Sequence, residues 1–445
     1  MQSLFVLSRR KKLLMTIPCV FILCVLTGIR DSRAETPSVE EMWEMIQQQQ
    51  TVIEELQAQL KSSEKKIAAT EKKVEEATEE VEAAAEAFET AQTSGGGSSW
   101  ADRTTVGGYG ELHYNNLSDD NDTVGGDNSL DRVDFHRFVL FFGHEFNDNI
   151  RFFSELEVEH AISGDGQPGE VELEQAWIEM DINDNHRFRA GLDILPIGII
   201  NRTHEPNTFY GVERNTVETE IIPATWWEAG VALNGEIAPG WNYDVVAHSG
   251  LVTPTTGSST LRPRSGRLKV GKADDQDIAF TGQLRYTGMP GLEVGISGQY
   301  QSDMTGTADA FDVDATLFEG HVDYKHNSGL GLRALYARWD IDAPVGITFT
   351  QNSIDGWYIE PAYRFRSPGV IPGELGVFTR YAEWDARGQG TVPDGTYVQY
   401  ESWNTGMNWW PHPNVVFKFD YQNESGDSRA AVISDGFNLG LGYQF

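Results

Sequence analysis

The chain has 445 residues and a formal net charge of −33, from 34 Lys and Arg against 67 Asp and Glu. A surface this acidic repels nucleic acid and anionic lipid, so we expect no nucleic-acid partner. Its two cysteines, Cys19 and Cys24, both lie in an N-terminal apolar run. We therefore expect no disulfide framework, cysteine catalysis or thiolate metal site in the rest of the chain.

Residues 1–34 have the pattern of an export signal. Four consecutive bases, Arg9 to Lys12, precede an apolar run from Leu13 to Leu26. This run is about as long as a signal-peptide core and too short for a helix that spans a membrane. Cleavage after Ala34 would remove six bases and one acid, which changes the net charge from −33 to −38.

Residues 35–93 are predicted to form a coiled coil. Apolar residues recur at intervals of seven, at Val39, Ile46, Ile53, Leu60, Ile67, Val74, Val81 and Phe88. The alternative is a solvated single helix. Several residues of this series are β-branched, which permits a trimer without requiring one. At about 1.5 Å per residue the rod would reach roughly 80 to 90 Å into the periplasm, toward the cell wall. A Gly/Ser hinge at residues 94–99 follows it.

The region 100–445 has the pattern of a large antiparallel β-barrel. Its last nine residues alternate apolar and polar and end on Phe445, an ending that resembles the recognition signal of outer-membrane barrels. Sixteen segments have strand character, an even number, as bacterial single-chain barrels have. They begin near Thr105, Val133, Ile150, Val171, Arg187, Thr225, Trp241, Ile278, Leu292, Val313, Gly331, Trp357, Leu375, Tyr397, Val415 and Phe437.

The connections between these segments alternate in length. Seven are tight turns, such as those at residues 147–149 and 183–185, and eight are longer and more polar. This asymmetry is typical of a barrel in the outer membrane of a diderm bacterium, with both termini in the periplasm. A two-sheet sandwich is the alternative fold.

Charged residues that alternate with apolar ones are candidates to line the pore, because sixteen strands leave an aqueous channel. The region 100–445 contains 19 Arg but only 4 Lys, and a guanidinium can hold anions in a wet channel. The alternative is ordinary pairing of these arginines with lumen acids. The second and fourth strands alternate poorly, so the sequence assigns Arg137, Glu172 and Glu174 to neither face. The pore-lining candidates are Arg151, Arg187, Arg189, Arg285, Arg333, Arg364, Arg366, Arg380, Glu155, Glu157 and Glu360.

The third long loop, residues 196–224, is a candidate constriction. It carries charged residues together with apolar residues that could hold it against the wall, such as Ile199, Phe209 and Ile221. The alternative is an outer loop that packs at a subunit interface. The constriction-loop candidates are Arg202, His204, Glu205, Glu213 and Arg214.

The charges leave the selectivity of such a pore open. The region 100–445 carries 23 bases and 51 acids, which favours cations at the mouths, whereas the arginine rows favour anions deeper in the lumen. A general or cation-preferring porin is therefore an alternative. The acids from Asp119 to Asp127 could bind calcium but lack the spacing of a helix-loop-helix calcium site. We expect no cofactor and no metal site.

Residues 100–445 carry a resemblance to a known family, and it is strongest over residues 187–235. The segments Gly191-Leu192, Pro196-Ile197-Gly198, His204-Glu205-Pro206, Gly211-Val212-Glu213-Arg214 and Ile221 to Glu228 are similar to those of porins in the phosphate-selective porin O and P family. The resemblance implies a trimeric, 16-stranded anion channel in which arginines and lysines guide phosphate. The lysine-rich constriction of that family has no match here, because no Lys occurs between Lys73 and Lys269.

An enzyme and a structural tether are the two other classes of function that such a chain could have. Some outer-membrane barrels are enzymes, but His136, His144, His160 and His204 show no catalytic motif spacing, so we expect no enzyme. A structural tether, with the stalk bound to peptidoglycan or another periplasmic partner, is the second alternative. The sequence favours a homotrimeric outer-membrane diffusion porin for small hydrophilic solutes, with its barrel in outer-membrane lipid.

Overall fold

A computed structural model describes residues 100–445 except 120–128, 272, 274–276, 307–311, 344–351, 370, 388–395 and 428–433. It also describes five isolated helical residues, Trp43, Gln47, Gln50, Gln57 and Lys61. Apart from these five, the predicted signal peptide, coiled coil and hinge lie outside the described residues. The chain divides into two compact units, Met1–Thr93 and Ser94–Phe445.

In the part of the second unit that the structure describes, there are sixteen strands and four short helical segments. The helical segments are η1 (Trp100–Arg103), α2 (Val217–Glu220), η2 (Gly257–Ser259) and η3 (Pro263–Gly266). The strands are β1 (Thr104–Asp119), β2 (Leu130–Asn147), β3 (Ile150–Glu159), β4 (Val171–Asn183), β5 (His186–Ile194), β6 (Trp227–Ala238), β7 (Trp241–His248), β8 (Ala279–Tyr286), β9 (Leu292–Gln301), β10 (Asp314–Lys325), β11 (Leu330–Asp342), β12 (Ser353–Arg366), β13 (Glu374–Arg387), β14 (Tyr397–His412), β15 (Val415–Gly426) and β16 (Ser434–Gln444).

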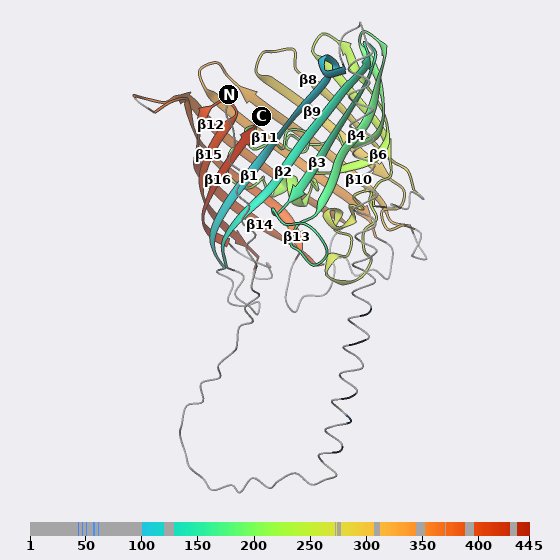
Figure 1. Ribbon diagram of the computed structural model, residues 1–445, viewed down its shortest axis with the longest axis vertical. Coiled ribbons are helices and arrows are strands. Elements are labelled where there is room, and N and C mark those ends of the chain that lie inside the picture. The colour runs from blue at the N-terminus through green and yellow to red at the C-terminus, as the bar shows by residue number, and fades with distance from the viewer. Residues whose placement is uncertain are drawn as a thin grey trace, which may run out of the picture. The chain divides into compact units, whose positions relative to one another are not determined.

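These strands form one closed antiparallel barrel in which every strand pairs with its neighbours in sequence (Figure 1). The prediction of a sixteen-stranded barrel is confirmed, and each strand begins within a few residues of its expected start. In the described part of the chain, no helix has the length and apolar character needed to cross a membrane.

The barrel closes where β1 pairs with β16. Their register runs from Tyr109 opposite Gln444 to Asp119 opposite Ser434. Beyond the ladder, the Phe445 N–H donates to Gly108 O at 3.0 Å, and Phe445 O accepts the Gly108 N–H at 3.1 Å. The apolar C-terminal residue is thus fixed at the end of the barrel that also carries the short turns.

The strand faces follow the expected alternation over much of the barrel. On β12, Tyr358 and Glu360 are buried inside while Ile359 and Tyr363 are exposed on the outer surface. A barrel whose outside contacts lipid hydrocarbon needs this apolar outer band, because polar groups there would lose their hydrogen bonds to water.

Two bulges explain why β2 and β4 alternate poorly. Glu111 pairs with Arg137 but His113 pairs with Asp134, so β2 carries an extra residue at this point. Likewise Glu155 pairs with Gln175 and the next pair skips Glu174 on β4. A bulge turns side chains away from the regular alternation. Both bulges lie on the same wall of the barrel, and Arg137 and Glu174 are buried there.

Candidate functional site: the lumen and its inward loop

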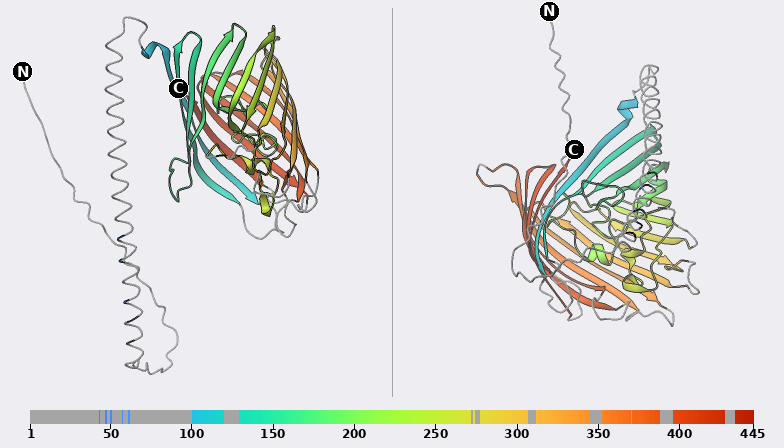
Figure 2. Two further views of the ribbon diagram at one scale, coloured as in Figure 1. Left: turned by 90° about the vertical axis from the view of Figure 1, so that its right-hand side faces the viewer. Right: turned by 60° about the horizontal axis from the view of Figure 1, so that its bottom comes forward.

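The connection between β5 and β6, residues 195–226, folds into the barrel, and we call it the inward loop. Figure 2 shows this segment, with α2, within the ring of strands. Its apolar residues Ile197, Val212 and Ile222 are almost fully buried. The loop therefore occupies the lumen instead of extending from the barrel rim.

Apolar packing anchors one side of the inward loop. Val217, Ile221 and Trp226 form one buried cluster with wall residues that include Leu335 and Trp339 of β11. The ring centroids of Trp226 and Trp339 are 6.2 Å apart, and the Trp339 indole N–H donates to Ile221 O at 2.8 Å. This side of the lumen is filled, so the open path lies elsewhere around the loop.

Glu218 of α2 is a buried polar anchor within this packing. One carboxylate oxygen accepts the amides of Ile199 and Ile200 at 2.8 and 2.6 Å, and the other accepts the Tyr358 hydroxyl at 2.6 Å. Burial raises the pKa of Glu218 from its ordinary value, while these hydrogen bonds oppose the shift. The carboxyl thus fixes the start of the inward loop to its helix and to β12.

Three strand arginines hold the backbone of the inward loop. Each guanidinium donates to a loop carbonyl: Arg137 to His204 O at 2.6 Å, Arg333 to Thr208 O at 2.7 Å and Arg380 to Tyr210 O at 2.8 Å. Each is also paired with a wall carboxylate, Glu111, Asp323 and Glu360 respectively. The predicted pore-lining residues Arg333, Arg380 and Glu360 are therefore engaged in supporting the loop.

His204 fixes the inward loop to the part of the wall formed by β3 and β4. Its Nδ1 is 3.1 Å from Asn201 O, and its Nε2 is 3.3 Å from Glu155 and 3.5 Å from Glu174. Burial alone would lower the pKa of His204, but the two carboxylates outweigh it and raise the pKa to about 10. We call this ion-paired group, Glu155, Glu174 and His204, the histidine latch.

The remaining predicted arginines are also mostly paired. Arg151 and Arg187 contact Asp181, and Arg189 contacts Glu179 at 2.7 Å and Asp193 at 2.6 Å. These three lie together on β3 and β5, on one part of the wall. Their pairing leaves little uncompensated positive charge on this part of the wall.

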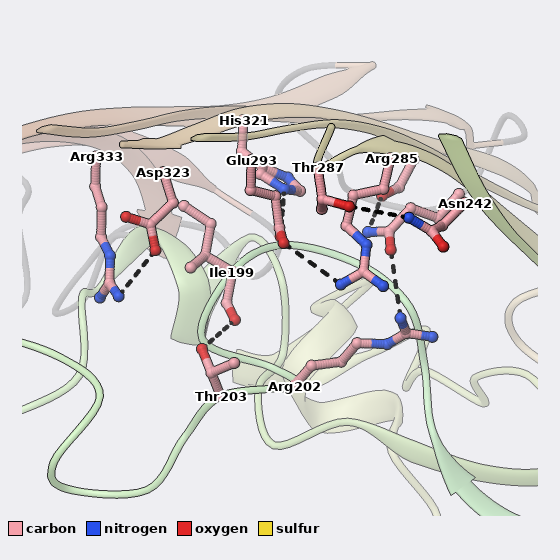
Figure 3. A network of polar contacts seen from close by, with 12 residues as sticks. Ile199, Arg202, Thr203, Asn242, Arg285, Thr287, Glu293, His321, Asp323 and Arg333 are labelled. Carbon is pink, nitrogen blue, oxygen red and sulfur yellow. Dashed lines mark hydrogen bonds and ion pairs between the residues drawn. The ribbon is translucent and has the colours of Figure 1, made fainter. Parts of the chain in front are cut away.

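A cavity of about 770 Å³ lies between the inward loop and the short-turn ends of β8 to β12. Figure 3 shows its wall, with Arg333 directed at Asp323 and Arg285 at Glu293, and with Arg202 of the loop facing them. The cavity is thus lined by both arginines and carboxylates, which lie close to one another.

Arg364 and Arg366 of β12 line the same cavity. Arg364 is 2.6 Å from Glu374 and lies over the Trp410 ring, 4.1 Å from its centroid. Arg366 is exposed and has no carboxylate partner among the residues that the structure describes. Of the eleven pore-lining candidates, Arg366 is the arginine that remains most available to a solute.

The predicted constriction residues have separate partners. Arg202 forms a two-point ion pair with Asp244 of β7. Glu213 contacts His113 at 3.1 Å and accepts the Asn115 amide at 2.9 Å, and His113 lowers the pKa of Glu213 against the effect of burial. Glu205 is partly exposed, and its carbonyl accepts the Thr208 N–H at 3.0 Å. Among the three basic residues of this set, Arg202 and His204 contact carboxylates, whereas Arg214 contacts none among the described residues.

Arg214 belongs to a group that we call the arginine cluster, with Arg264 and Arg267 of the next long loop. Arg214 donates to Thr225 Oγ1 at 2.7 Å, Arg267 donates to Thr225 O, and Arg264 donates to Ala224 O at 3.0 Å. In the described part of the chain none of the three has a carboxylate partner. Burial, followed by repulsion from Arg267, lowers the pKa of Arg264 to about 10.

The arginine cluster faces an acidic wall on β3 and β4. The carboxylates that attract Arg267 most are those of Glu172, Glu174 and Glu159, and Arg214 also interacts with Glu174. Positive charge on the loops and negative charge on the wall create a field across the lumen.

Sequence reasoning missed Arg264 and Arg267, although a signal was present. Residues 245–273 contain no acid and five bases in a chain whose net charge is −33. Such a segment is unusual in an acidic chain, and it marks the fourth long loop as a positive element.

Comparison with known proteins agrees with this architecture. The family described as "Phosphate-selective porin O and P" matches residues 106–445. A protein of Aquifex aeolicus (strain VF5), described only as uncharacterized, is 28% identical over 376 residues, which cover 77% of this chain and 80% of that protein.

Solved structures with a similar fold are porins. The anion-selective porin from Comamonas acidovorans has a TM-score of 0.52 at 12% identity and is covered to 99%. The outer membrane channel DcaP of Acinetobacter baumannii has a TM-score of 0.50 at 15% identity and is covered to 97%. OmpF of Salmonella typhi, in complex with daunomycin, has a TM-score of 0.51 at 13% identity and is also covered to 97%. In each case 77% of this chain is aligned.

The family match covers the whole barrel, and the barrel encloses a lumen narrowed by an inward loop. The chain belongs to the phosphate-selective porin O and P family, and the protein is an outer-membrane diffusion porin.

Proposed function

We propose that the channel prefers anions and that the arginine cluster, Arg214, Arg264 and Arg267, sets this preference. The observation that carries the proposal is that these three guanidinium groups lie together without a carboxylate partner among the described residues. A permanently charged group whose charge is not neutralised locally attracts anions, and the field is strongest in a narrow passage.

The cluster is a better candidate than the ion-paired arginines of the strands. Arg189, Arg333 and Arg380 each contact a carboxylate, so their fields are largely cancelled at the distance of a passing ion. The name of the family refers to phosphate selectivity, and one structural neighbour is named an anion-selective porin. Both descriptions agree with the proposed preference.

The test is the reversal potential of single channels across a KCl gradient, recorded with the protein from residue 35 to 445. Coulomb's law in water gives about 0.5 kcal/mol between unit charges roughly 8 Å apart, so each arginine removed should lower local anion occupancy about twofold. The Arg214→Gln, Arg264→Gln and Arg267→Gln changes together should therefore lower local chloride occupancy roughly eightfold. The chloride-to-potassium permeability ratio should fall by at least this factor, because potassium occupancy rises at the same time.

Arg103→Gln is the matched control, because Arg103 lies in η1 at the short-turn end and pairs with Asp148 outside the lumen. It should leave the reversal potential unchanged. A triple variant that keeps the selectivity of the unmodified channel would refute the assignment of selectivity to the cluster. Cation preference in the unmodified channel would instead support a general porin.

The proposal extends to phosphate as a bound anion. A guanidinium presents paired N–H donors that match two oxygens of a phosphate, and several adjacent guanidinium groups can hold one ion. In the same recordings, added phosphate should reduce the chloride current of the unmodified channel, and the triple variant should lose this block.

We also propose a homotrimer whose coiled-coil stalk extends into the periplasm toward peptidoglycan or another partner. The support is the heptad pattern of residues 35–93, with β-branched residues that permit three strands. Deletion of residues 35–93 should leave the single-channel conductance unchanged while weakening attachment of the outer membrane to the cell wall. Chemical crosslinking of both forms would report the subunit number. Loss of conductance on deletion would contradict a separate stalk.

A further inference from the structure

The lumen contains a third cluster of polar side chains, separate from the histidine latch and the arginine cluster. Asp134 and His136 lie on β2 near the long-loop end of the barrel, and His160 follows the last residue of β3 at the same end. One donor atom from each residue lies within 4.8 Å of the other two. The sequence provided no motif for such a group, because the three residues are brought together only by strand pairing.

The two oxygens of one carboxylate face two different imidazole rings. His160 Nδ1 is 2.8 Å from Asp134 Oδ1, and His136 Nδ1 is 3.5 Å from Asp134 Oδ2. Ligands at about 2.0 to 2.1 Å from a tetrahedral metal are roughly 3.3 Å from one another. Small side-chain rotations would therefore place all three donors around one ion.

The backbone at the end of β3 holds His160 in this position. The His160 N–H donates to His136 O at 3.1 Å. His160 and Ala161 have φ values of 52° and 53°, a left-handed conformation that residues other than glycine rarely adopt. This turn directs the imidazole back across the end of β2, toward Asp134.

A neighbouring histidine supports the ring of His136 without competing for a ligand. The rings of His113 and His136 are stacked, with centroids 4.6 Å apart and an angle of 12° between the planes. Both nitrogens of His113 are already engaged, by Glu111 and by Glu213, each at 3.1 Å. His136 has no other carboxylate partner than Asp134 among the described residues.

The cluster is accessible from the lumen. The side chains of His136 and His160 are 37% and 31% exposed, and that of Asp134 is 12% exposed. The histidine latch differs in this respect, because its three residues are fully buried and both nitrogens of His204 have partners. An ion in the external medium could reach the cluster of Asp134, His136 and His160 through the long-loop end of the pore.

We propose that Asp134, His136 and His160 form a binding site for a divalent transition metal ion in the outer part of the pore. Two imidazole nitrogens and one carboxylate suit Zn²⁺, Ni²⁺ or Cu²⁺, whereas Mg²⁺ and Ca²⁺ prefer oxygen ligands. Three protein ligands leave a coordination position open toward lumen water. The bound ion and the ligands that it holds narrow the outer part of the pore, so they reduce the current.

The first experiment measures Zn²⁺ binding to tag-free purified protein by isothermal titration calorimetry, with Mg²⁺ as the comparison ion. One Zn²⁺ per chain is expected, and Mg²⁺ should not bind at this site. His136→Gln and His160→Gln should each weaken Zn²⁺ binding roughly tenfold or more, since each removes a ligand. His326→Gln is the matched control, because His326 is an exposed histidine in the turn between β10 and β11.

Cu²⁺ provides a spectroscopic test that does not depend on conductance. Its paramagnetic resonance spectrum should show coupling to two imidazole nitrogens in the unmodified protein and to one in either histidine variant. Asp134→Asn is a further variant, and folding of each is checked by the heat-dependent gel mobility of the barrel. If one variant fails to fold, the other two decide the question.

The effect on the pore is measured in the same bilayer recordings. Zn²⁺ added on the long-loop side should reduce the current through the unmodified and His326→Gln channels, but not through His136→Gln. Zn²⁺ binding that none of the three ligand variants weakens, or equal binding of Mg²⁺, would overturn the proposal. Channels that conduct without anion preference but still bind Zn²⁺ would refute the proposed selectivity alone.

Discussion

Arginine side chains in the lumen fall into two groups, which differ in the partners of the guanidinium. Arg137, Arg333 and Arg380 donate to carbonyls of the inward loop and also contact carboxylates, so their charge is used within the protein. Arg214 and Arg264 have only hydroxyl and carbonyl partners among the described residues. A hydrogen bond to a neutral acceptor leaves the positive charge available to an anion.

His204 should make the stability of the porin depend on pH. Its pKa in the folded protein, about 10, lies above the ordinary value of 6.5. The stabilisation from the histidine latch is therefore complete below about pH 6.5 and is lost as the pH rises toward 10. The difference in unfolding midpoint between the unmodified protein and His204→Asn should be largest at pH 6 and should shrink by pH 10, measured by urea unfolding.

His326→Asn is the control for this measurement, because the exposed His326 has no carboxylate partner among the described residues. Its unfolding midpoint should follow that of the unmodified protein at every pH. A midpoint difference for His204→Asn that stays constant from pH 6 to pH 10 would mean that the imidazolium does not stabilise the fold. The histidine latch would then stabilise the fold through packing and not through the charge of His204.

At the level of strands and loops, much of the fold could be predicted because most strands are amphipathic. Residues such as Tyr358 and Ile359 alternate between the lumen and lipid, and period-two alternation is visible in the sequence alone. The bulges at Arg137 and Glu174 could not be predicted, because an extra residue breaks the alternation without a distinctive residue type.

The site was less predictable than the strands, because its interactions join segments far apart in the chain. The apolar residues of the inward loop indicated that the loop could be held against a wall, and Ile221 is indeed buried beside Trp339. The ion pairs of Arg189 and Arg333 depend on strand register, which the sequence leaves open. The arginine cluster needs Arg214 and Arg264 to meet across two loops, which no local pattern encodes.

Across the molecule as a whole, the acidic charge and the arginine cluster should oppose each other. The region 100–445 has a net charge of −28, and its acids are spread over the mouths, the loops and the lumen wall, whereas the cluster gathers three positive charges at one place in the lumen. Screening lengths of about 10 Å at 0.1 M salt and about 3 Å at 1 M weaken the distant acids more than groups that a passing ion touches.

Selectivity should consequently depend on salt concentration. At a constant concentration ratio across the membrane, the chloride-to-potassium permeability ratio should rise when the mean KCl concentration is increased from 0.1 M to 1 M. The ratio for the triple variant Arg214→Gln, Arg264→Gln and Arg267→Gln should rise toward about 1 and no further, because screening the acids then reveals no positive site. A permeability ratio that falls with salt in the unmodified channel would mean that the anion preference comes from distant charge, and a role for the cluster would be excluded.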